Sequence, residues 1–226
     1  MFSRLELLVG NKINLIKGKT VLIVGLGGVG SYVVEGLVRS GIESFIIVDY
    51  DKIDISNLNR QLMTNQNNIG EFKTDEIEKR ILSINPNCNI IKFNKKIDKD
   101  NINELFEFNI DYVVDACDTL EVKLELIRIC KKKNIKLIAS MGTGNKMDPS
   151  RLKIMDISKT SYDPLAKKIR KVVKDERLGK VMVVCSDEVG FTKVDKVIPS
   201  NSFVPATSGL LITSYIIRDI VGDLNV

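Results

Sequence analysis

The sequence predicts an α/β protein built on a Rossmann-like, doubly wound and mostly parallel sheet. A short apolar run at 21–24 leads into a glycine-rich turn and then into a helical segment at 31–40. Similar short apolar runs alternate with helical segments as far as about residue 140, which is typical of a sheet covered by helices on both faces. We expect one domain over 1–226, with a core at about 1–145 and a C-terminal β/α elaboration at about 146–226.

The core begins with an expected helix from 3 to about 17, whose apolar side carries Leu5, Leu8 and Ile16 and which Gly18 ends. Runs of β-branched and other apolar residues predict strands at 21–24, 45–48, 89–93, 112–114 and 137–139. Apolar residues at helical spacing predict helices at 31–40, 73–84, 102–108 and 121–133. Gly41 suits the end of the first of these helices.

The C-terminal elaboration adds expected strands at 152–157 and 181–184. A helix is expected at 164–174, because Pro164 suits a first helical turn. The segment 206–221 is so apolar that we expect a helix packed on the core or on a partner subunit.

The glycine-rich turn carries the first functional signal. Gly25, Gly27 and Gly30 have the G-x-G-x-x-G spacing, and Gly28 adds a fourth glycine. Such a turn lets a nucleotide phosphate approach backbone N–H groups at the start of a helix. On its own the turn fits a dinucleotide cofactor, ATP or S-adenosylmethionine, or a tight turn with no ligand.

Asp49 ends the second predicted strand, at the place where an acidic residue accepts hydrogen bonds from a ribose. This position favours an unphosphorylated ribose over NADP, although a strand-end Asp also caps turns. The following loop brings Asn57, Arg60 and Gln61 together, and Lys73 begins the next helix. Guanidinium, ammonium and amide groups suit a triphosphate. An NAD-dependent oxidoreductase has no need of that cluster.

The composition narrows the chemistry. The chain has no histidine, so acid–base work falls to other side chains or to the substrate itself. Its four cysteines form no C-x-x-C pair, which argues against a cysteine zinc site and suits a reducing compartment. No apolar run approaches the roughly 20 residues that span a bilayer, and the N-terminus lacks a signal-peptide pattern. We therefore expect a cytoplasmic enzyme with no membrane partner.

Together these motifs resemble the adenylating enzymes of the ubiquitin-activating (E1-like) superfamily. The resemblance covers residues 4 to about 140 and rests on the glycine turn, Asp49-x-Asp51, the segment 56–61, Lys73 and the Asp115-Ala116-Cys117-Asp118 element. The C-terminal third is similar to the branch that dehydrates threonylcarbamoyladenosine in tRNA, through 156–160, 163–170, Ser186-x-Glu188 and 203–206. The sulfur-carrier activators of the superfamily usually carry paired zinc cysteines, which this chain lacks.

The resemblance implies ATP and Mg²⁺ as cofactors and assigns a role to each motif. It implies that Asp49 holds the ribose, that Asn57, Arg60 and Lys73 place the phosphates, and that Asp118 contacts magnesium or the nucleotide. The expected nucleotide-binding set is Gly25, Gly27, Gly28, Gly30, Asp49, Asp51, Asn57, Arg60, Gln61, Lys73 and Asp118. The expected catalytic set is Arg60, Lys73, Asp118 and Arg4. By position, Arg4 would reach into the site of a partner subunit.

The implied reaction is an ATP-dependent cyclisation of threonylcarbamoyladenosine in tRNA through adenylation of its carboxylate. The implied partners are the modified tRNA, a second copy of the chain, and a sulfur-transfer or redox protein. The basic segment offers a tRNA contact through Lys167, Lys168, Arg170, Lys171 and Lys174, unless it is simply a solvated helix face. We expect Cys117 to be structural, and a covalent role for Cys185 is a minor alternative.

Three alternative functions are also compatible with the sequence. The main alternative is an enzyme of the same superfamily that adenylates the C-terminus of a ubiquitin-like sulfur-carrier protein. The second is an NAD-dependent oxidoreductase. The third is a nucleotide-binding or tRNA-binding module without catalytic activity.

Overall fold

The computed structural model describes residues 1–192 and 197–222. Its centre is a seven-stranded sheet with the order β3-β2-β1-β4-β5-β7-β6. The strands are β1 (Thr20–Val24), β2 (Ser44–Val48), β3 (Asn89–Phe93), β4 (Tyr112–Asp115), β5 (Lys136–Ser140), β6 (Leu152–Asp156) and β7 (Met182–Ser186). All neighbours pair in parallel except β6 and β7, which pair antiparallel. The predicted Rossmann-like fold is confirmed.

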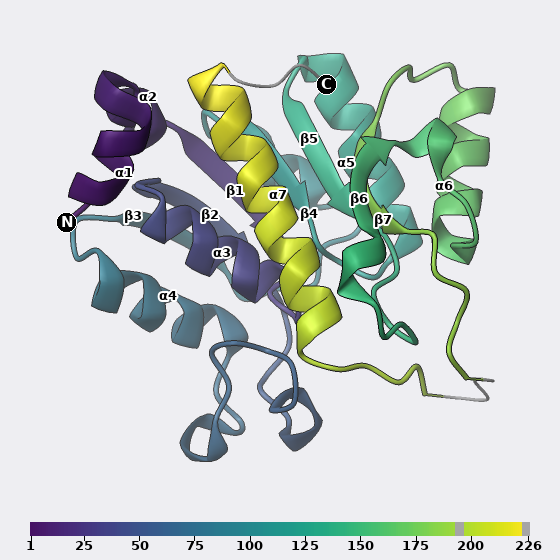
Figure 1. Ribbon diagram of the computed structural model, residues 1–226, viewed down its shortest axis with the longest axis horizontal. Helices are drawn as coiled ribbons and strands as arrows, with labels where there is room; N and C mark the ends of the chain where they lie inside the picture. Colours follow the sequence, from purple (N-terminus) through teal and green to yellow (C-terminus); the bar gives the residue numbers. More distant parts are fainter. Residues whose placement is uncertain (193–196, 223–226) are drawn as a thin grey trace.

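Helices cover both faces of this sheet (Figure 1). They are α1 (Ser3–Val9), α2 (Ile13–Lys17), α3 (Gly30–Arg39), α4 (Lys73–Ile84), α5 (Leu120–Lys133), α6 (Pro164–Asp175) and α7 (Phe203–Val221). Short 3₁₀ turns lie at Gly10–Lys12, Ile55–Asn57, Gln66–Asn68, Ile102–Glu107, Pro149–Arg151 and Ile157–Lys159. No helix of the described residues is long and apolar enough to cross a membrane.

The strands place alternate side chains on the two faces, as a pleated strand must. In β1, Val21 and Ile23 pack with α3 and α7, whereas Leu22 and Val24 pack with α5. Because both faces are covered, all four of these β1 side chains are apolar and buried.

The predicted N-terminal helix is wrong as a single element. Gly10 adopts φ +61°, and a 3₁₀ turn separates α1 from α2. Leu8 is therefore 82% exposed, while Ile13 and Ile16 reach the core. Smaller corrections are that the segment 102–108 is a 3₁₀ turn and that the last helix begins at Phe203 rather than residue 206.

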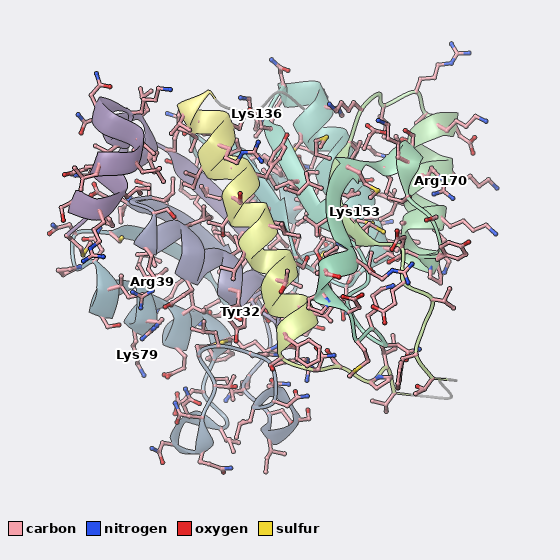
Figure 2. The ribbon with its side chains drawn as sticks, viewed as in Figure 1. Tyr32, Arg39, Lys79, Lys136, Lys153 and Arg170 are labelled. Atoms are coloured by element: carbon pink, nitrogen blue, oxygen red, sulfur yellow. The ribbon has the colours of Figure 1, made fainter. Side chains whose placement is uncertain are left out.

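Helix α7 lies across one face of the sheet beside α3, and small residues let the two helices approach closely (Figure 1). A Cβ atom at Gly209 would lie 2.6 Å from the Val29 carbonyl oxygen and 2.9 Å from the Tyr32 Cβ. Tyr32 marks this contact in Figure 2. A Cβ at Gly36 would meet the Thr213 hydroxyl at 2.6 Å. The final helix thus packs on the core, one of its two predicted positions.

Gly209→Ala tests this contact. The added methyl group meets backbone atoms that cannot move independently, so we expect the free energy of unfolding to fall by about 1–3 kcal/mol despite the better helix propensity of alanine. The measurement is urea denaturation. Gly18→Ala is the control, because its Cβ would meet nothing closer than 3.5 Å. A Gly209→Ala protein as stable as the wild type would show that α3 and α7 do not need the close approach.

Candidate active site

The carboxyl ends of four neighbouring strands converge on one cavity of about 840 Å³. The glycine turn follows β1, Asp49 follows β2, Asp118 follows β4 and Met141 follows β5. The chain leaves β1 and β4 toward opposite sides of the sheet, and such a switch point opens a crevice where ligands bind in doubly wound folds. The cavity therefore lies where the fold predicts a ligand site.

The four glycines of the turn differ in what surrounds them. Gly25 has φ +92°, and a Cβ there would lie 2.7 Å from the Ala116 carbonyl oxygen. A Cβ at Gly30 would lie 1.9 Å from the Gly25 carbonyl oxygen, so these two glycines close the turn on itself. Gly25, Gly27 and Gly28 line the cavity, whereas Gly30 does not. Only part of the predicted glycine set faces the cavity.

Asp49 joins the end of β2 to the glycine turn. Its carboxylate accepts hydrogen bonds from the Leu26 N–H at 2.7 Å and from the Asp51 N–H at 2.9 Å. Burial raises the pKa of Asp49 above its usual value, and the nearby Lys73 ammonium offsets part of that rise. Asp49 thus caps the turn while lining the cavity, so the two roles that the sequence left open are compatible.

Lys73 begins α4 and is only 5% exposed. Its ammonium lies 2.6 Å from the Asp51 carboxylate and 3.9 Å from that of Asp49. The two acids neutralise a buried cation that faces the cavity, as a buried charge requires. The two acids thereby hold in place the ammonium that the sequence predicts to bind phosphate.

The loop after β2 places the remaining predicted side chains. The Asn57 side-chain oxygen accepts from the Asp54 N–H at 3.1 Å, so Asn57 stabilises the loop while lining the cavity. Arg60 donates to the Ser56 carbonyl at 2.7 Å and to the Asn59 side chain at 2.9 Å. Gln61 is 6% exposed, and its side-chain oxygen has no hydrogen-bond partner among the described residues. An orphaned acceptor beside a cavity suits a ligand that donates a hydrogen bond.

A buried ion pair behind the cavity was not predicted from the sequence. Lys123 and Asp115 are fully buried, with 3.0 Å between the ammonium and the carboxylate. Lys123 also donates to the Ser140 carbonyl at 2.9 Å, and the Ser140 and Ser208 hydroxyls lie 3.0 Å apart. Burial acts to lower the pKa of Lys123, but the carboxylate beside it outweighs this and the pKa lies above its usual value. The pair favours a loop-holding role for Asp115 over metal binding.

The two cysteines that the sequence singled out are structural in character. The Cys117 thiol donates to the Asp115 carboxylate at 3.1 Å, and burial raises its pKa. Burial raises the pKa of Cys185 to about 12. Neither environment favours a thiolate, which is the reactive form.

Asp118 lies exposed on the loop after β4, lines the cavity and accepts from the Thr119 hydroxyl at 3.4 Å. The described part of the chain holds no cluster of three or more acidic, cysteine or histidine side chains that could bind a metal alone. Mg²⁺ commonly binds to one or two carboxylates together with substrate phosphates. Asp118 fits that arrangement and does not fit an all-protein metal cage.

The far half of the cavity is lined by segments that were not among the predicted nucleotide-binding residues. Its lining includes residues 140–146, 162–165, Gly190, Ile198 and Ser200. Tyr162 stands 70% exposed at this side with φ +57°, while Lys146 is 6% exposed. The Glu188 carboxylate holds the loop by accepting from the Met147 N–H at 2.8 Å and the Asp148 N–H at 3.0 Å.

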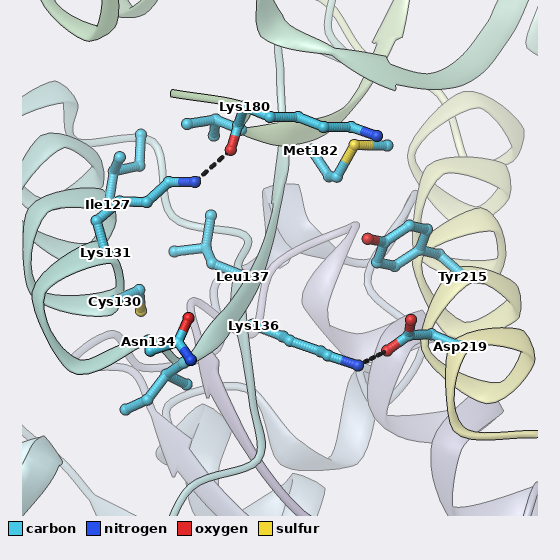
Figure 3. A pocket seen from close by; sticks show the side chains of 12 residues that line it. Ile127, Cys130, Lys131, Asn134, Lys136, Leu137, Lys180, Met182, Tyr215 and Asp219 are labelled. Atoms are coloured by element: carbon cyan, nitrogen blue, oxygen red, sulfur yellow. Dashed lines mark hydrogen bonds and ion pairs between the residues drawn. The ribbon is translucent and has the colours of Figure 1, made fainter. Parts of the chain in front are cut away.

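Two predicted features lie away from the cavity. Arg4 is exposed on α1 and does not line the cavity, so its reach into a partner subunit stays a prediction. A smaller hollow of about 310 Å³ lies at the amino ends of β5 and β7 (Figure 3). There Lys136 pairs with Asp219 at 2.6 Å, and none of the predicted ligand residues takes part.

The basic segment forms the outer face of α6. Lys167, Lys168, Lys171 and Lys174 are exposed, and within the described residues no carboxylate lies within 4.0 Å of their ammonium groups. Arg170 differs from them, because it donates to the Thr160 hydroxyl at 2.7 Å and is partly buried (Figure 2). Four of the five predicted tRNA contacts are therefore free for a ligand, and Arg170 anchors the segment before α6.

Known proteins are similar to this chain over most of its length. A sequence profile of the ThiF family matches residues 5–214. The Bacillus subtilis tRNA threonylcarbamoyladenosine dehydratase is 38% identical over 244 residues, which cover 100% of this chain and 96% of that relative. The Escherichia coli protein of the same name is 34% identical over 190 residues, covering 84% of this chain and 69% of that relative.

The fold of a solved relative is also close. The crystal structure of E. coli tRNA N6-threonylcarbamoyladenosine dehydratase in complex with AMP matches with a TM-score of 0.92 at 30% identity, covering 98% of this chain and 94% of that chain. The same E. coli protein in complex with ATP matches with a TM-score of 0.91. The chain belongs to the ThiF family.

Proposed function

We propose that this protein is an ATP-dependent enzyme that cyclises threonylcarbamoyladenosine in tRNA with net loss of water. The observation that carries the proposal is the single cavity into which Gly27, Gly28, Arg60 and Lys73 converge from three segments of the chain. The full-length similarity to relatives named for this activity supports the substrate.

The lining residues fit an adenine nucleotide. Gly27 and Gly28 let phosphates approach the backbone N–H groups before α3, and Asp49 lies one strand away for the ribose. The unpartnered side-chain oxygen of Gln61 can accept a hydrogen bond from the bound ligand. Arg60 and Lys73 add positive charge where the triphosphate would lie.

The first chemical step joins the substrate carboxylate to AMP. A carboxylate oxygen forms a bond to the α-phosphorus of ATP, and the bond to the bridging oxygen breaks as pyrophosphate leaves. Negative charge grows on the departing oxygens, and Arg60 and Lys73 are placed to stabilise it.

The second step closes the ring. The carbamoyl group of the same nucleoside attacks the activated carboxyl carbon, the bond to AMP breaks, and one proton is lost. Because nucleophile and electrophile are already tethered, high effective molarity supplies much of the acceleration. A chain without histidine can therefore support the reaction.

Asp118, together with phosphate oxygens, would hold Mg²⁺. The ion supplies charge neutralisation of the phosphates when it is bound. We also assign the exposed lysines of α6 to the tRNA backbone, since Tyr162 and Pro164 connect that helix directly to the cavity.

A homodimer, the reach of Arg4 into the second copy and a sulfur-transfer or redox partner remain predictions from the family. The same holds for a cytoplasmic location, which is where an enzyme acting on tRNA would meet its substrate.

Formation of AMP with different acceptors tests the function. We expect AMP and pyrophosphate to form from ATP in the presence of tRNA that carries threonylcarbamoyladenosine. The modified nucleoside should lose about 18 mass units, the mass of one water molecule. Unmodified tRNA is the control and should give no AMP. AMP formed only with a sulfur-carrier protein ending in Gly-Gly would favour the main alternative, and ATP binding without AMP from any acceptor would favour a non-catalytic module.

Arg60→Ala and Lys73→Ala test the phosphate assignment. Each variant removes a preorganised charge from the developing pyrophosphate, so we expect turnover to fall at least about 10²-fold. The controls are Arg39→Ala and Lys79→Ala, which remove exposed cations from α3 and α4 outside the cavity (Figure 2). Normal turnover in either cavity variant would refute the assignment of that residue.

Charge reversal on α6 tests the tRNA contact. We expect Lys167→Glu, Lys168→Glu and Lys171→Glu together to weaken tRNA binding and to reduce its salt dependence, with each lost phosphate contact removing roughly 0.7–0.9 from the log–log slope. The matched control combines Lys99→Glu, Lys132→Glu and Lys133→Glu, which change the same charge at exposed positions elsewhere. The measurement is affinity against salt concentration, and equal behaviour of the two triple variants would exclude α6 from the contact.

A further inference from the structure

Lys146 is a buried cation that the nucleotide-binding residues leave unexplained. It follows β5 on the connection to β6, lines the cavity and is only 6% exposed. Its ammonium donates to the Glu188 carbonyl oxygen at 2.8 Å. An ammonium has three donors, so two remain for other partners.

Among the described residues, no carboxylate pairs with this charge. Over residues 1–192 and 197–222, no acidic side chain lies within 4.0 Å of the Lys146 ammonium. Two buried acids on this side of the molecule, Glu188 and Asp163, already accept hydrogen bonds from backbone N–H groups. Glu188 accepts from the Met147 and Asp148 N–H groups, and Asp163 accepts from the Gly142 and Ala166 N–H groups.

A buried charge without a counter-ion is costly unless something else pairs with it. Lys73 shows how this chain treats a comparable lysine, because two carboxylates lie within 4.0 Å of its ammonium. Lys146 lines the same cavity without such a pair. Over the part of the chain that the structure describes, its environment is that of an anion site without its anion.

The order of the strands indicates which anion would lie beside Lys146. The ribose and phosphate residues follow β2 and β1, and Asp118 follows the adjacent β4. Lys146 follows β5, one strand further on, at the side of the cavity that leads to Tyr162 and α6. The nucleotide would occupy the β2 side, so the acid to be activated enters from the β5 side.

We propose that Lys146 binds the carboxylate of the threonyl group in the substrate tRNA. The assignment rests on the proposed function and names the residue that recognises the reacting group. A carboxylate and a triphosphate repel each other, and a fixed ammonium beside the carboxylate offsets that repulsion while holding the oxygen toward the α-phosphorus. The bond changes are those of the adenylation step, and Lys146 keeps its proton throughout.

The loop does not depend on the Lys146 charge for its shape. The Glu188 carboxylate holds the backbone of the next two residues, and Asn201 donates to the Lys146 carbonyl oxygen at 2.7 Å. A neutral side chain at position 146 should therefore leave the loop in place, which makes a substitution informative.

The test compares the affinities of modified and unmodified tRNA without ATP, so that no turnover occurs. Only the modified tRNA carries the carboxylate. In Lys146→Gln we expect the preference for modified tRNA to fall about tenfold or more, the size expected for hydrogen bonds to a charged group, with ATP affinity within about twofold of the wild type. Lys146→Arg should keep most of the preference. Lys153→Gln is the control, because it makes the same change at an exposed lysine outside the cavity. Lys153 lies on β6 and pairs with Asp187 at 3.4 Å (Figure 2).

A second arm needs no variant. Modified tRNA whose threonyl carboxylate is a methyl ester should bind the wild-type protein about tenfold more weakly than the free acid, and should bind Lys146→Gln as well as the acid does. An unchanged preference in Lys146→Gln, or equal binding of ester and acid by the wild type, would overturn the assignment. If the wild type forms no AMP with modified tRNA, the proposed function itself is wrong, and the two failures are thus distinguishable.

Discussion

The buried ion pair between Asp115 and Lys123 is the contact on which the cavity depends. Removing one partner of such a pair typically costs about 3–5 kcal/mol, because the other charge is left buried without compensation. The pair joins the end of β4 to α5, and the Lys123 bond to the Ser140 carbonyl extends the connection to β5. The contact between the Ser140 and Ser208 hydroxyls connects β5 in turn to α7. The loops that carry Asp118 and Lys146 both begin at the strand ends that these contacts hold.

A second constraint is the close approach of backbones at the glycine turn. Gly25 and Gly30 leave no room for side chains, because the turn folds against itself and against Ala116. Asp49 then fastens the turn to β2 through the Leu26 N–H. With the turn held at both ends, Gly27 and Gly28 line the cavity between these fixed points. Glycine therefore has two roles in this turn: it allows the close backbone packing, and it leaves backbone exposed to the cavity.

Local patterns in the sequence predicted one half of the site and missed the other. The segments 73–84 and 89–93 have the bounds that their apolar spacing indicates, and the residues from the glycine turn to Lys73 lie close together in sequence. The N-terminal helix was wrong because Gly10 takes a left-handed conformation that periodicity does not reveal. Lys123 was missed as a structural residue, although a lysine among the inward positions of a predicted helix could have signalled a buried acid. Lys146 and Glu188 meet across 42 positions of the chain, and no local pattern reports such a contact.

The distribution of charge around the cavity follows from these constraints. On the β2 side, the Lys73 ammonium is paired with the Asp51 carboxylate and lies near that of Asp49. Toward β5, Lys146 has only a carbonyl partner among the described residues, and its field extends into the cavity. The exposed lysines of α6 lie beyond Tyr162 on this same side of the cavity. On the proposed function, they would attract the phosphate backbone of the substrate at the surface, and Lys146 would attract its carboxylate inside the cavity.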